Sequence, residues 1–284
     1  MTLNPIQSVA VVAPAGVASD GRIERGLDAL RAYDVDVTIV PIGEPPRHYL
    51  AGNDAYRAAA MQRAWAMDVD AIWALRGGFG CVRTLAALGS YTDSKPLFGF
   101  SDITTLLVHA PVAWHAPVIT QLPNLDIRSR DALRDVLTGR YRSIPLDSER
   151  TIIKPGAAVG KLIAGNLTVL SSLCGTPWQA NLDGCILCLE DVGEPPYRVD
   201  RSWTQLRLSG ALDGLRGLVI GRFTGVVPGE QETLSMLFEE MAQDVDGPVV
   251  RVLSIGHLAE NIPIPIGRLA ELRDDSGYLQ IRWG

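Results

Sequence analysis

Ser101 lies where the sequence would present a nucleophile. The apolar run 95–100 predicts a buried strand, and Ser101 begins the predicted helix 101–109 that follows directly. At such a strand–helix turn the side chain faces the carboxyl edge of the sheet, and the backbone N–H of Asp102 lies at a helix N-terminus that could stabilise an oxyanion. Ile103 stands where the second glycine of the Gly-x-Ser-x-Gly signature would be, and serine is also a favoured helix N-cap. Nucleophile and plain cap therefore both remain open for this residue alone.

An acid and a histidine follow two further predicted strands. Glu190 and Asp191 come directly after the apolar strand 185–189, and His257 follows a glycine just beyond another strand. A serine hydroxyl needs a base within hydrogen-bond reach, and that base needs a carboxylate to fix its tautomer. Exposed loop acids and a structural histidine are the alternatives for each residue by itself. Because all the parts occur in a known chain order, Ser, Glu, His, we predict a serine hydrolase with Ser101 as nucleophile.

The loop Arg76–Gly80 (Arg-Gly-Gly-Phe-Gly) follows the predicted strand 70–75. Glycines at a strand end let the backbone approach a ligand, so the loop could bind phosphate, supply an oxyanion donor or simply turn tightly. The sequence has neither a Walker lysine nor the Gly-x-Gly-x-x-Gly fingerprint here, so we expect no nucleotide or other organic cofactor.

Cys185 and Cys188 have the spacing of half a zinc site. They lie in an apolar run that predicts a buried strand, and no second Cys/His pair has matching spacing, so we expect no metal. The other two cysteines, Cys81 and Cys174, suggest no disulfide framework, which favours a reducing, cytoplasmic location.

Charge and hydropathy exclude several classes of protein. The net charge is −6, so no basic surface indicates nucleic acid or anionic lipid. The apolar stretch 9–18 resembles a signal-peptide core, but no Lys or Arg precedes Arg22. The long uncharged stretches 103–125 and 162–182 contain prolines and amides and are typical of buried segments, so we expect no membrane span.

Strands and helices are predicted to alternate along the chain. Strands are predicted at 8–13, 35–40, 70–75, 95–100, 117–122, 185–189, 218–223 and 249–254. Helices are predicted at 21–33, 56–67, a stretch ending at 85, 101–109, 166–173, 202–208 and 232–241, and a hairpin is predicted over 274–277. This alternation predicts an α/β fold with a mostly parallel sheet covered on both faces. A loosened pattern suggests an N-terminal domain over 1–140, a linker over 141–160 and a C-terminal domain over 161–284.

Nearly the whole chain resembles the LD-carboxypeptidase family of serine peptidases. The motifs that carry the resemblance are Val-Ala-Pro-Ala-Gly at 12–16, Tyr-Leu-Ala-Gly at 49–52, Leu-Arg-Gly-Gly-Phe-Gly at 75–80, Gly-Phe-Ser-Asp-Ile-Thr at 99–104, Gly-Asn-Leu-Thr-Val-Leu at 165–170, Gly-Thr-Pro-Trp at 175–178, Leu-Glu-Asp at 189–191 and Gly-His at 256–257. The resemblance implies a flavodoxin-like N-terminal domain, a C-terminal domain of mixed sheet and helices, and a homodimer. It also implies Ser101 as nucleophile, Glu190 as triad acid, His257 as base, and the backbone N–H groups of Gly78 and Asp102 as oxyanion donors.

The activity that the resemblance implies is removal of the terminal D-alanine from murein tetrapeptide during cytosolic cell-wall recycling. A carboxypeptidase must hold a terminal carboxylate, and arginine suits that task, which makes Arg76, Arg198 and Arg201 candidates. Thr-Gln-Leu-Pro-Asn at 120–124 replaces the Gly-Pro pair often found in the family, in a segment expected to border the substrate cleft. A microcin-immunity type of peptidase that cleaves peptidyl nucleotides is the alternative enzyme, and a non-catalytic two-domain binding protein is the alternative from another class.

Overall fold

Two compact units make up the chain, Thr2–Tyr141 and Arg142–Gly284, here called the N-terminal and the C-terminal unit. The computed structural model describes residues 4–41, 45–146, 150–275 and 278–282. Within these ranges no helix is long and apolar enough to cross a membrane.

Parallel strands form the centre of the N-terminal unit. They are β1 (Ser8–Val12), β2 (Asp36–Ile39), β3 (Ala71–Ala74), β4 (Leu97–Gly99) and β5 (Ala113–His115). They lie in the order β2-β1-β3-β4-β5, and every neighbouring pair is parallel. This is the flavodoxin-like order, in which sites lie at the carboxyl edge near β1 and β3, where the strand order reverses.

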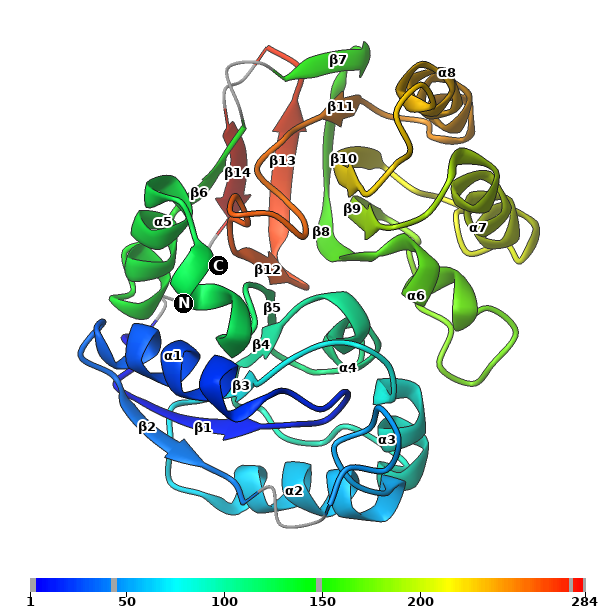
Figure 1. Ribbon diagram of the computed structural model, residues 1–284. Helices are drawn as coiled ribbons and strands as arrows, with labels where there is room; N and C mark the ends of the chain where they lie inside the picture. Colours follow the sequence, from blue (N-terminus) through cyan, green and yellow to red (C-terminus); the bar gives the residue numbers. More distant parts are fainter. Residues whose placement is uncertain (1–3, 42–44, 147–149, 276–277, 283–284) are drawn as a thin grey trace. The chain divides into compact units, whose positions relative to one another are not determined.

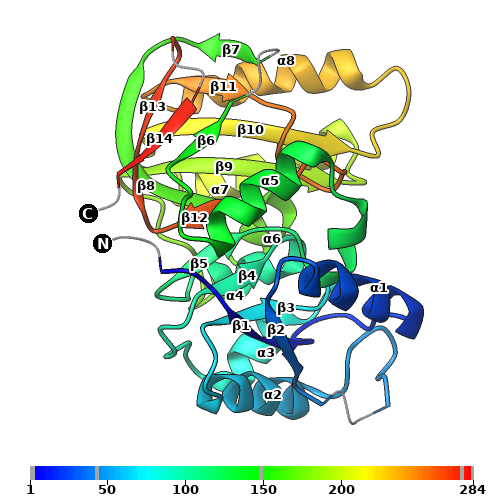
Figure 2. The same ribbon diagram turned by 90° about the vertical axis from the view of Figure 1, so that its left-hand side faces the viewer.

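Helices cover both faces of these strands. They are α1 (Asp20–Arg31), α2 (Asp54–Ala66), α3 (Cys81–Leu88), α4 (Thr104–Leu107) and α5 (Ile127–Leu137), with the 3₁₀ turns η1 (Ser101–Ile103) and η2 (Ile119–Asn124). Figures 1 and 2 show α1 and α2 on opposite sides of β1 and β2. Because both faces are covered, a central strand is apolar along its whole length, as in β3, where all four residues are buried.

The C-terminal unit contains a mixed sheet. Its strands are β6 (Ser143–Pro145), β7 (Thr151–Lys154), β8 (Ala157–Asn166), β9 (Cys185–Val192), β10 (Gly217–Thr224), β11 (Val249–Arg251), β13 (Leu269–Arg273) and β14 (Tyr278–Arg282), and β12 (Ile264–Ile266) is a further short strand. The sheet order is β6-β14-β13-β8-β9-β10-β11-β7. The strands β8 to β11 are mutually parallel, and the flanking pairs are antiparallel.

Three helices lie along the parallel part of this sheet. They are α6 (Leu167–Ser172), α7 (Pro196–Leu208) and α8 (Gln231–Met241), followed by the 3₁₀ turn η3 (Ala242–Asp244). Figure 1 shows them on the same side of the central strands, and Figure 2 shows β9, β10 and β11 side by side. The α/β fold class, with a parallel N-terminal sheet and a mixed C-terminal sheet, is therefore confirmed.

Several predicted element boundaries are wrong. The strand expected at 117–122 is instead β5 at Ala113–His115, because Pro117 has no N–H for the ladder and Ile119–Asn124 turns into a 3₁₀ helix. The helix expected at 202–208 begins at Pro196, which supplies the fixed φ of a first helical turn. The hairpin between β13 and β14 is present, although Ser276 and Gly277 of its predicted turn lie outside the described residues.

The segment 141–160 contains strands where we expected a linker. It holds β6, β7 and the first residues of β8, all hydrogen-bonded into the C-terminal sheet. The strands β6 and β7 are the two edges of that sheet, and the first residues of β8 are largely exposed, so an apolar pattern is not required there. The division between the units falls at Tyr141 and Arg142.

Two glycines of α1 provide a matched test of its packing. A Cβ on Gly26 would lie 2.4 Å from the carbonyl oxygen of Ile119, whereas a Cβ on Gly21 would lie 3.7 Å from the flexible end of Arg25. We expect Gly26→Ala to destabilise by about 1–3 kcal/mol through overpacking and Gly21→Ala to stabilise by about 0.5–1 kcal/mol. Urea unfolding followed by circular dichroism measures both midpoints, and a lower midpoint for Gly21→Ala than for Gly26→Ala would contradict this packing.

Candidate active site

Ser101 occupies a sharp turn between β4 and η1. Its φ is 64°, a left-handed conformation that costs a non-glycine residue on the order of 1–3 kcal/mol and is typical of functional turns. A Cβ on Gly99 would lie 2.7 Å from Cγ2 of Ile103, so glycine is needed where the chain folds back on itself. Ile103 stands where the second glycine of the Gly-x-Ser-x-Gly signature would be. Its side chain packs against Gly99, the first glycine, so the turn forms without the second glycine. The predicted helix 101–109 is the 3₁₀ turn η1 followed by the short helix α4.

The glycine loop after β3 packs directly against Ser101. A Cβ on Gly77 would lie 2.9 Å from Cβ and 3.0 Å from Oγ of Ser101, so no larger residue fits there. The carbonyl of Gly77 accepts a hydrogen bond from the N–H of Gly16 at 3.1 Å, which ties this loop to the loop after β1. Gly78 is exposed with a φ of 110°, a conformation that favours glycine. The structure thus brings together Ser101, Asp102 and the loop that holds Gly78.

Glu190 and His257 form a close pair in the C-terminal unit. The Nδ1 atom of His257 lies 2.5 Å from Oε2 of Glu190, whose side chain is completely buried, while the His257 side chain is 18% exposed. We expected Glu190 to follow its strand. The structure instead places it within β9, which continues to Val192. Engagement of Nδ1 by a carboxylate orients the ring and directs Nε2 to proton transfer.

Asn166 supports this pair and was missed as a site residue by the sequence reasoning. It ends β8 as the register partner of Glu190, and its Nδ2 donates to Oε1 of Glu190 at 3.3 Å and to Oδ1 of Asp191 at 2.9 Å. Its Oδ1 caps α6 by accepting from the N–H of Val169. An asparagine at a strand end that also begins a helix was the signal that could have identified it.

Asp191 has a structural role beside the pair. Its carboxylate accepts hydrogen bonds from the N–H and the hydroxyl of Thr168, at 2.9 and 2.8 Å, in the first turn of α6. All its described partners belong to β8, α6 and β9. The two adjacent acids therefore have different partners: Asp191 holds the first turn of α6, whereas Glu190 holds His257.

The segment that carries His257 is held by β10. The strand β11 ends at Arg251, earlier than the predicted 254, and Arg222 of β10 donates to the carbonyl of Leu253 and to that of Ile255. Gly256 has a φ of 142°, and a Cβ there would lie 3.0 Å from Cβ of Arg222 and 3.6 Å from Cβ of Glu190. Glycine therefore lets the chain approach Glu190 closely enough for the next residue, His257, to reach the carboxylate.

Burial changes the acidity of two carboxyl groups, Glu190 in the C-terminal unit and Asp102 in the N-terminal unit. It raises the pKa of Glu190, while the hydrogen bonds from His257 and Asn166 oppose that shift. It also raises the pKa of Asp102, against the hydrogen bond from the N–H of Cys81. Both carboxylates are thus costly to ionise unless their donors stay in place.

The three candidate arginines are engaged locally. Arg76 is partly buried and donates to the carbonyl of Val17. Arg198 lies 3.4 Å from a carboxylate oxygen of Glu194, and both Arg198 and Arg201 lie over the ring of Tyr197.

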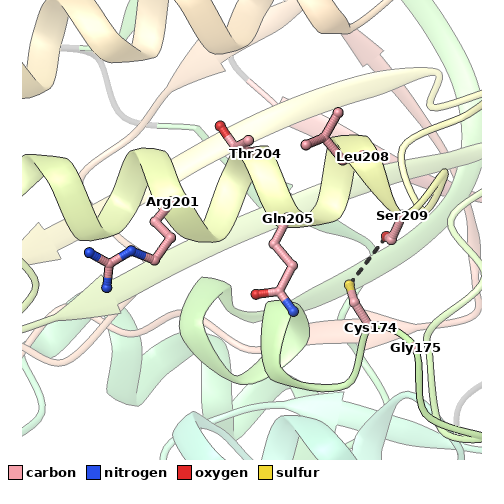
Figure 3. Close-up of a pocket in the computed structure, with 7 residues that line it drawn as sticks. All are labelled: Cys174, Gly175, Arg201, Thr204, Gln205, Leu208 and Ser209. Atoms are coloured by element: carbon pink, nitrogen blue, oxygen red, sulfur yellow. Dashed lines mark hydrogen bonds between the residues drawn. The ribbon is translucent and has the colours of Figure 1, made fainter.

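Arg201 also lines a cavity of about 500 Å³ on the surface of the C-terminal unit (Figure 3). The other lining residues come from α7 and from the segment after α6. Figure 3 shows Cys174 hydrogen-bonded to Ser209, at 3.3 Å, at one end of this cavity. Neither Glu190 nor His257 lines the cavity, so it is separate from the histidine–carboxylate pair.

The cysteines are free and mostly buried. Cys185 and Cys188 lie within β9, as predicted, and burial raises the pKa of Cys188 to about 12. Among the described residues, no group of three or more His, Cys, Asp or Glu side chains is arranged to hold a metal ion.

Comparison with known proteins relates the whole chain to one family. The family model of the LD-carboxypeptidase N-terminal domain matches residues 9–120, and that of the LD-carboxypeptidase C-terminal domain matches residues 159–272. The murein tetrapeptide carboxypeptidase of Pseudomonas aeruginosa is 33% identical, over 99% of this chain and 97% of the relative. The crystal structure of muramoyltetrapeptide carboxypeptidase from Oxalobacter formigenes is 26% identical with a TM-score of 0.81, covering 97% of this chain and 98% of that one.

The microcin C7 self-immunity protein MccF is similar in fold. Its wild-type apo structure has a TM-score of 0.86 and covers 100% of this chain and 99% of its own, at 18% sequence identity. At that identity the likeness concerns the fold alone.

Gly77→Ala tests the close approach of the glycine loop to Ser101. The added methyl group would collide with the serine side chain, and a misplacement of about 1 Å can cost roughly 10²-fold in rate. We expect the rate at which a fluorophosphonate labels Ser101 to fall by about that factor. Gly21→Ala on α1 is the control and should label at the wild-type rate, and equal rates for all three proteins would contradict the expected collision.

Glu190→Gln tests the burial of the Glu190 carboxylate. The folded pKa lies above the unfolded one, so ionisation of Glu190 weakens the folded state. Its contribution to stability is complete below the unfolded pKa and is lost as pH rises through the folded pKa. We therefore expect wild type to lose stability relative to Glu190→Gln as pH rises above 4.5, in urea unfolding at a series of pH values.

The activity of Glu190→Gln should change in the opposite sense to its stability: above pH 4.5 the variant gains stability relative to wild type, but it should lose activity. Labelling of Ser101 in Glu190→Gln should fall by about 10³- to 10⁴-fold, because an amide can hold the wrong tautomer of His257. Glu271→Gln, which changes a carboxylate of β13 paired with Arg282 at 2.7 Å, is the matched control for both measurements. A gain in the stability of wild type relative to Glu190→Gln as pH rises would instead show that His257 more than compensates the burial of the charge.

Proposed function

This chain belongs to the LD-carboxypeptidase family of serine-type hydrolases, and we propose that it releases the terminal D-alanine from murein tetrapeptide. The observation that carries the proposal is the contact of 2.5 Å between Nδ1 of His257 and the buried carboxylate of Glu190. A histidine held in this way is the base that a serine nucleophile requires.

The proposed reaction begins with attack by Ser101. Nε2 of His257 takes the proton from the hydroxyl as Oγ bonds to the carbonyl carbon of the scissile peptide, and Glu190 stabilises the imidazolium. Collapse of the tetrahedral intermediate breaks the C–N bond, and His257 gives its proton to the leaving amine of D-alanine. Water then hydrolyses the acyl-enzyme with the same base. The proposal requires His257 to come within hydrogen-bond reach of Ser101 during the reaction.

Stabilisation of the oxyanion is assigned to backbone donors. We place the N–H groups of Gly78 and Asp102 in this role, because Asp102 follows the nucleophile in a turn and Gly78 lies in the loop that packs on Ser101. A donor of this kind is typically worth about 10²–10³-fold in kcat.

The murein substrate is supported by the relatives. A relative named for murein tetrapeptide is 33% identical over nearly the full length, whereas MccF is only 21% identical, over 90% of this chain. Of the three candidate arginines, we place Arg76 first for the terminal carboxylate of the substrate, because it directly precedes Gly77 in the loop against Ser101. Arg198 and Arg201 are second candidates, since both already lie over Tyr197.

A cytoplasmic location and a homodimer belong to the same proposal. Four free cysteines suit a reducing compartment, and the recycling of cell-wall peptides would supply the substrate there. The homodimer rests on the resemblance to the family.

Ser101→Ala tests the reaction and the nucleophile together. Wild type and variant are incubated with free L-Ala-γ-D-Glu-meso-diaminopimelyl-D-Ala, and the products are identified by mass spectrometry. We expect D-alanine from wild type and at least 10³-fold less from the variant, because the attacking hydroxyl is gone. Full activity of the variant would refute the nucleophile. Cleavage of an aminoacyl sulfamoyl nucleoside, with no release from the tetrapeptide, would assign the microcin-immunity type of substrate instead.

A further inference from the structure

The peptide group between Gly80 and Cys81 is held from both sides in the N-terminal unit. This peptide joins the glycine loop after β3 to the first residue of α3. Its N–H donates to Oδ2 of Asp102 at 2.8 Å. Its carbonyl accepts from the N–H of Thr84 at 2.9 Å and lies 3.5 Å from the guanidinium of Arg57.

Asp102 reaches this peptide from the turn of the nucleophile. Its side chain is buried, with 4% exposure, and among the described contacts its carboxylate is directed at the N-terminus of α3. A buried carboxylate is costly unless it is hydrogen-bonded, so this bond is a requirement of the fold at that point. Because Asp102 directly follows Ser101, the bond links the nucleophile's own turn to the glycine loop.

Arg57 anchors the other side of the same peptide. Its side chain is completely buried and donates to the carbonyl of Gly52 at 2.7 Å and to Oγ1 of Thr84 at 2.9 Å, besides its contact with Gly80. The Thr84 hydroxyl in turn donates to the carbonyl of Pro14, in the loop after β1. The end of the glycine loop is therefore fixed against rigid elements on this side.

The beginning of the loop is fixed as well. The carbonyl of Gly77 accepts from Gly16, and Gly77 packs against the Ser101 side chain. Gly78 lies between these two anchor points, three residues before Cys81, with a φ that needs glycine. The direction of its N–H thus depends on both anchors, and the anchor nearer to α3 includes the Asp102 carboxylate.

We propose that Asp102 is a positioning residue. Its side chain holds the Gly80–Cys81 peptide and thereby fixes the position of the oxyanion donor, the N–H of Gly78, relative to Ser101. This role is distinct from that of the Asp102 backbone N–H, and it rests on the proposed function of Ser101 and Gly78. The positioning role also explains why an ionisable residue occupies this position, although burial raises the pKa of Asp102.

The role predicts an effect on the rate of the chemical step and little effect on substrate binding. In Asp102→Ala the N–H of Cys81 loses its acceptor, and the loop can relax away from Ser101. Misplacement of one oxyanion donor costs about 10²–10³-fold in kcat. Asp102→Asn keeps an oxygen that can accept the same hydrogen bond and should retain activity within about tenfold of wild type.

The experiment measures kcat and KM for D-alanine release from the tetrapeptide, and the rate of fluorophosphonate labelling of Ser101, in wild type, Asp102→Ala and Asp102→Asn. The control is Asp70→Ala, because Asp70 also accepts backbone N–H groups, those of Gln7 and Ser8 at 2.8 Å, at the opposite end of β3. We expect about 10²-fold lower kcat with KM within about twofold for Asp102→Ala, rescue by Asn, and an unchanged kcat for Asp70→Ala. If Asp102→Ala does not fold, Asp102→Ser is measured in its place. We expect the same loss of kcat, since the serine side chain is too short to reach the N–H of Cys81.

Wild-type kcat in Asp102→Ala, or an Asn variant as impaired as the Ala variant, would overturn the positioning role. Full D-alanine release by Ser101→Ala would overturn the proposed function instead. If wild type labels at Ser101 but releases no D-alanine, the substrate assignment fails, and the labelling rates of the same variants still decide the role of Asp102.

Discussion

A carboxylate inside a buried strand costs several kcal/mol unless hydrogen-bond donors surround it, and Glu190 occupies such a position in β9. Apart from Glu190 and Asp191 the strand is apolar on both faces, since it lies between β8 and β10 in the parallel part of the sheet. Two donors meet its carboxylate, the amide of Asn166 and the ring of His257. The geometry around Glu190 in the C-terminal unit follows from this single requirement.

The surrounding chain is shaped by the same requirement. Asn166 reaches Glu190 because the register of β8 and β9 pairs them, and it leaves β8 at that point to begin α6. His257 reaches Glu190 because Gly256 lets the backbone approach the strand without a Cβ in the way. A histidine bound in this way has one tautomer and one orientation. Burial of the acid costs stability, but it leaves the proposed base oriented in advance for proton transfer.

The N-terminal unit uses comparable chemistry with a different geometry. Ser101 is held in a left-handed turn, and the buried carboxylate of Asp102 joins that turn to the start of α3. In both units a buried acid is hydrogen-bonded by groups from another element. In both, a residue beside the acid carries a proposed catalytic atom: Ser101 precedes Asp102 in sequence, and His257 contacts Glu190. Burial of charge therefore connects stability to function here, because loss of the donor would weaken the fold and displace the reactive group together.

The sequence by itself determined the α/β class, the parallel N-terminal sheet and the strand–turn position of Ser101, because apolar runs and glycines report local conformation directly. It also identified Glu190 and His257 as a candidate pair from residue types that only certain chemistries require. It could not place 117–122 or 141–160 correctly, since a short apolar stretch forms a strand or a 3₁₀ turn according to its neighbours, and peripheral strands need no apolar pattern. Only the tertiary structure decided that Glu190 is buried within β9, that Asn166 bridges it to Asp191, and that the side chain of Asp102 meets the N–H of Cys81. Together with the His257–Glu190 pair, these contacts join residues 21 to 67 positions apart along the chain, and sheet register and loop closure, which no local pattern encodes, bring them together.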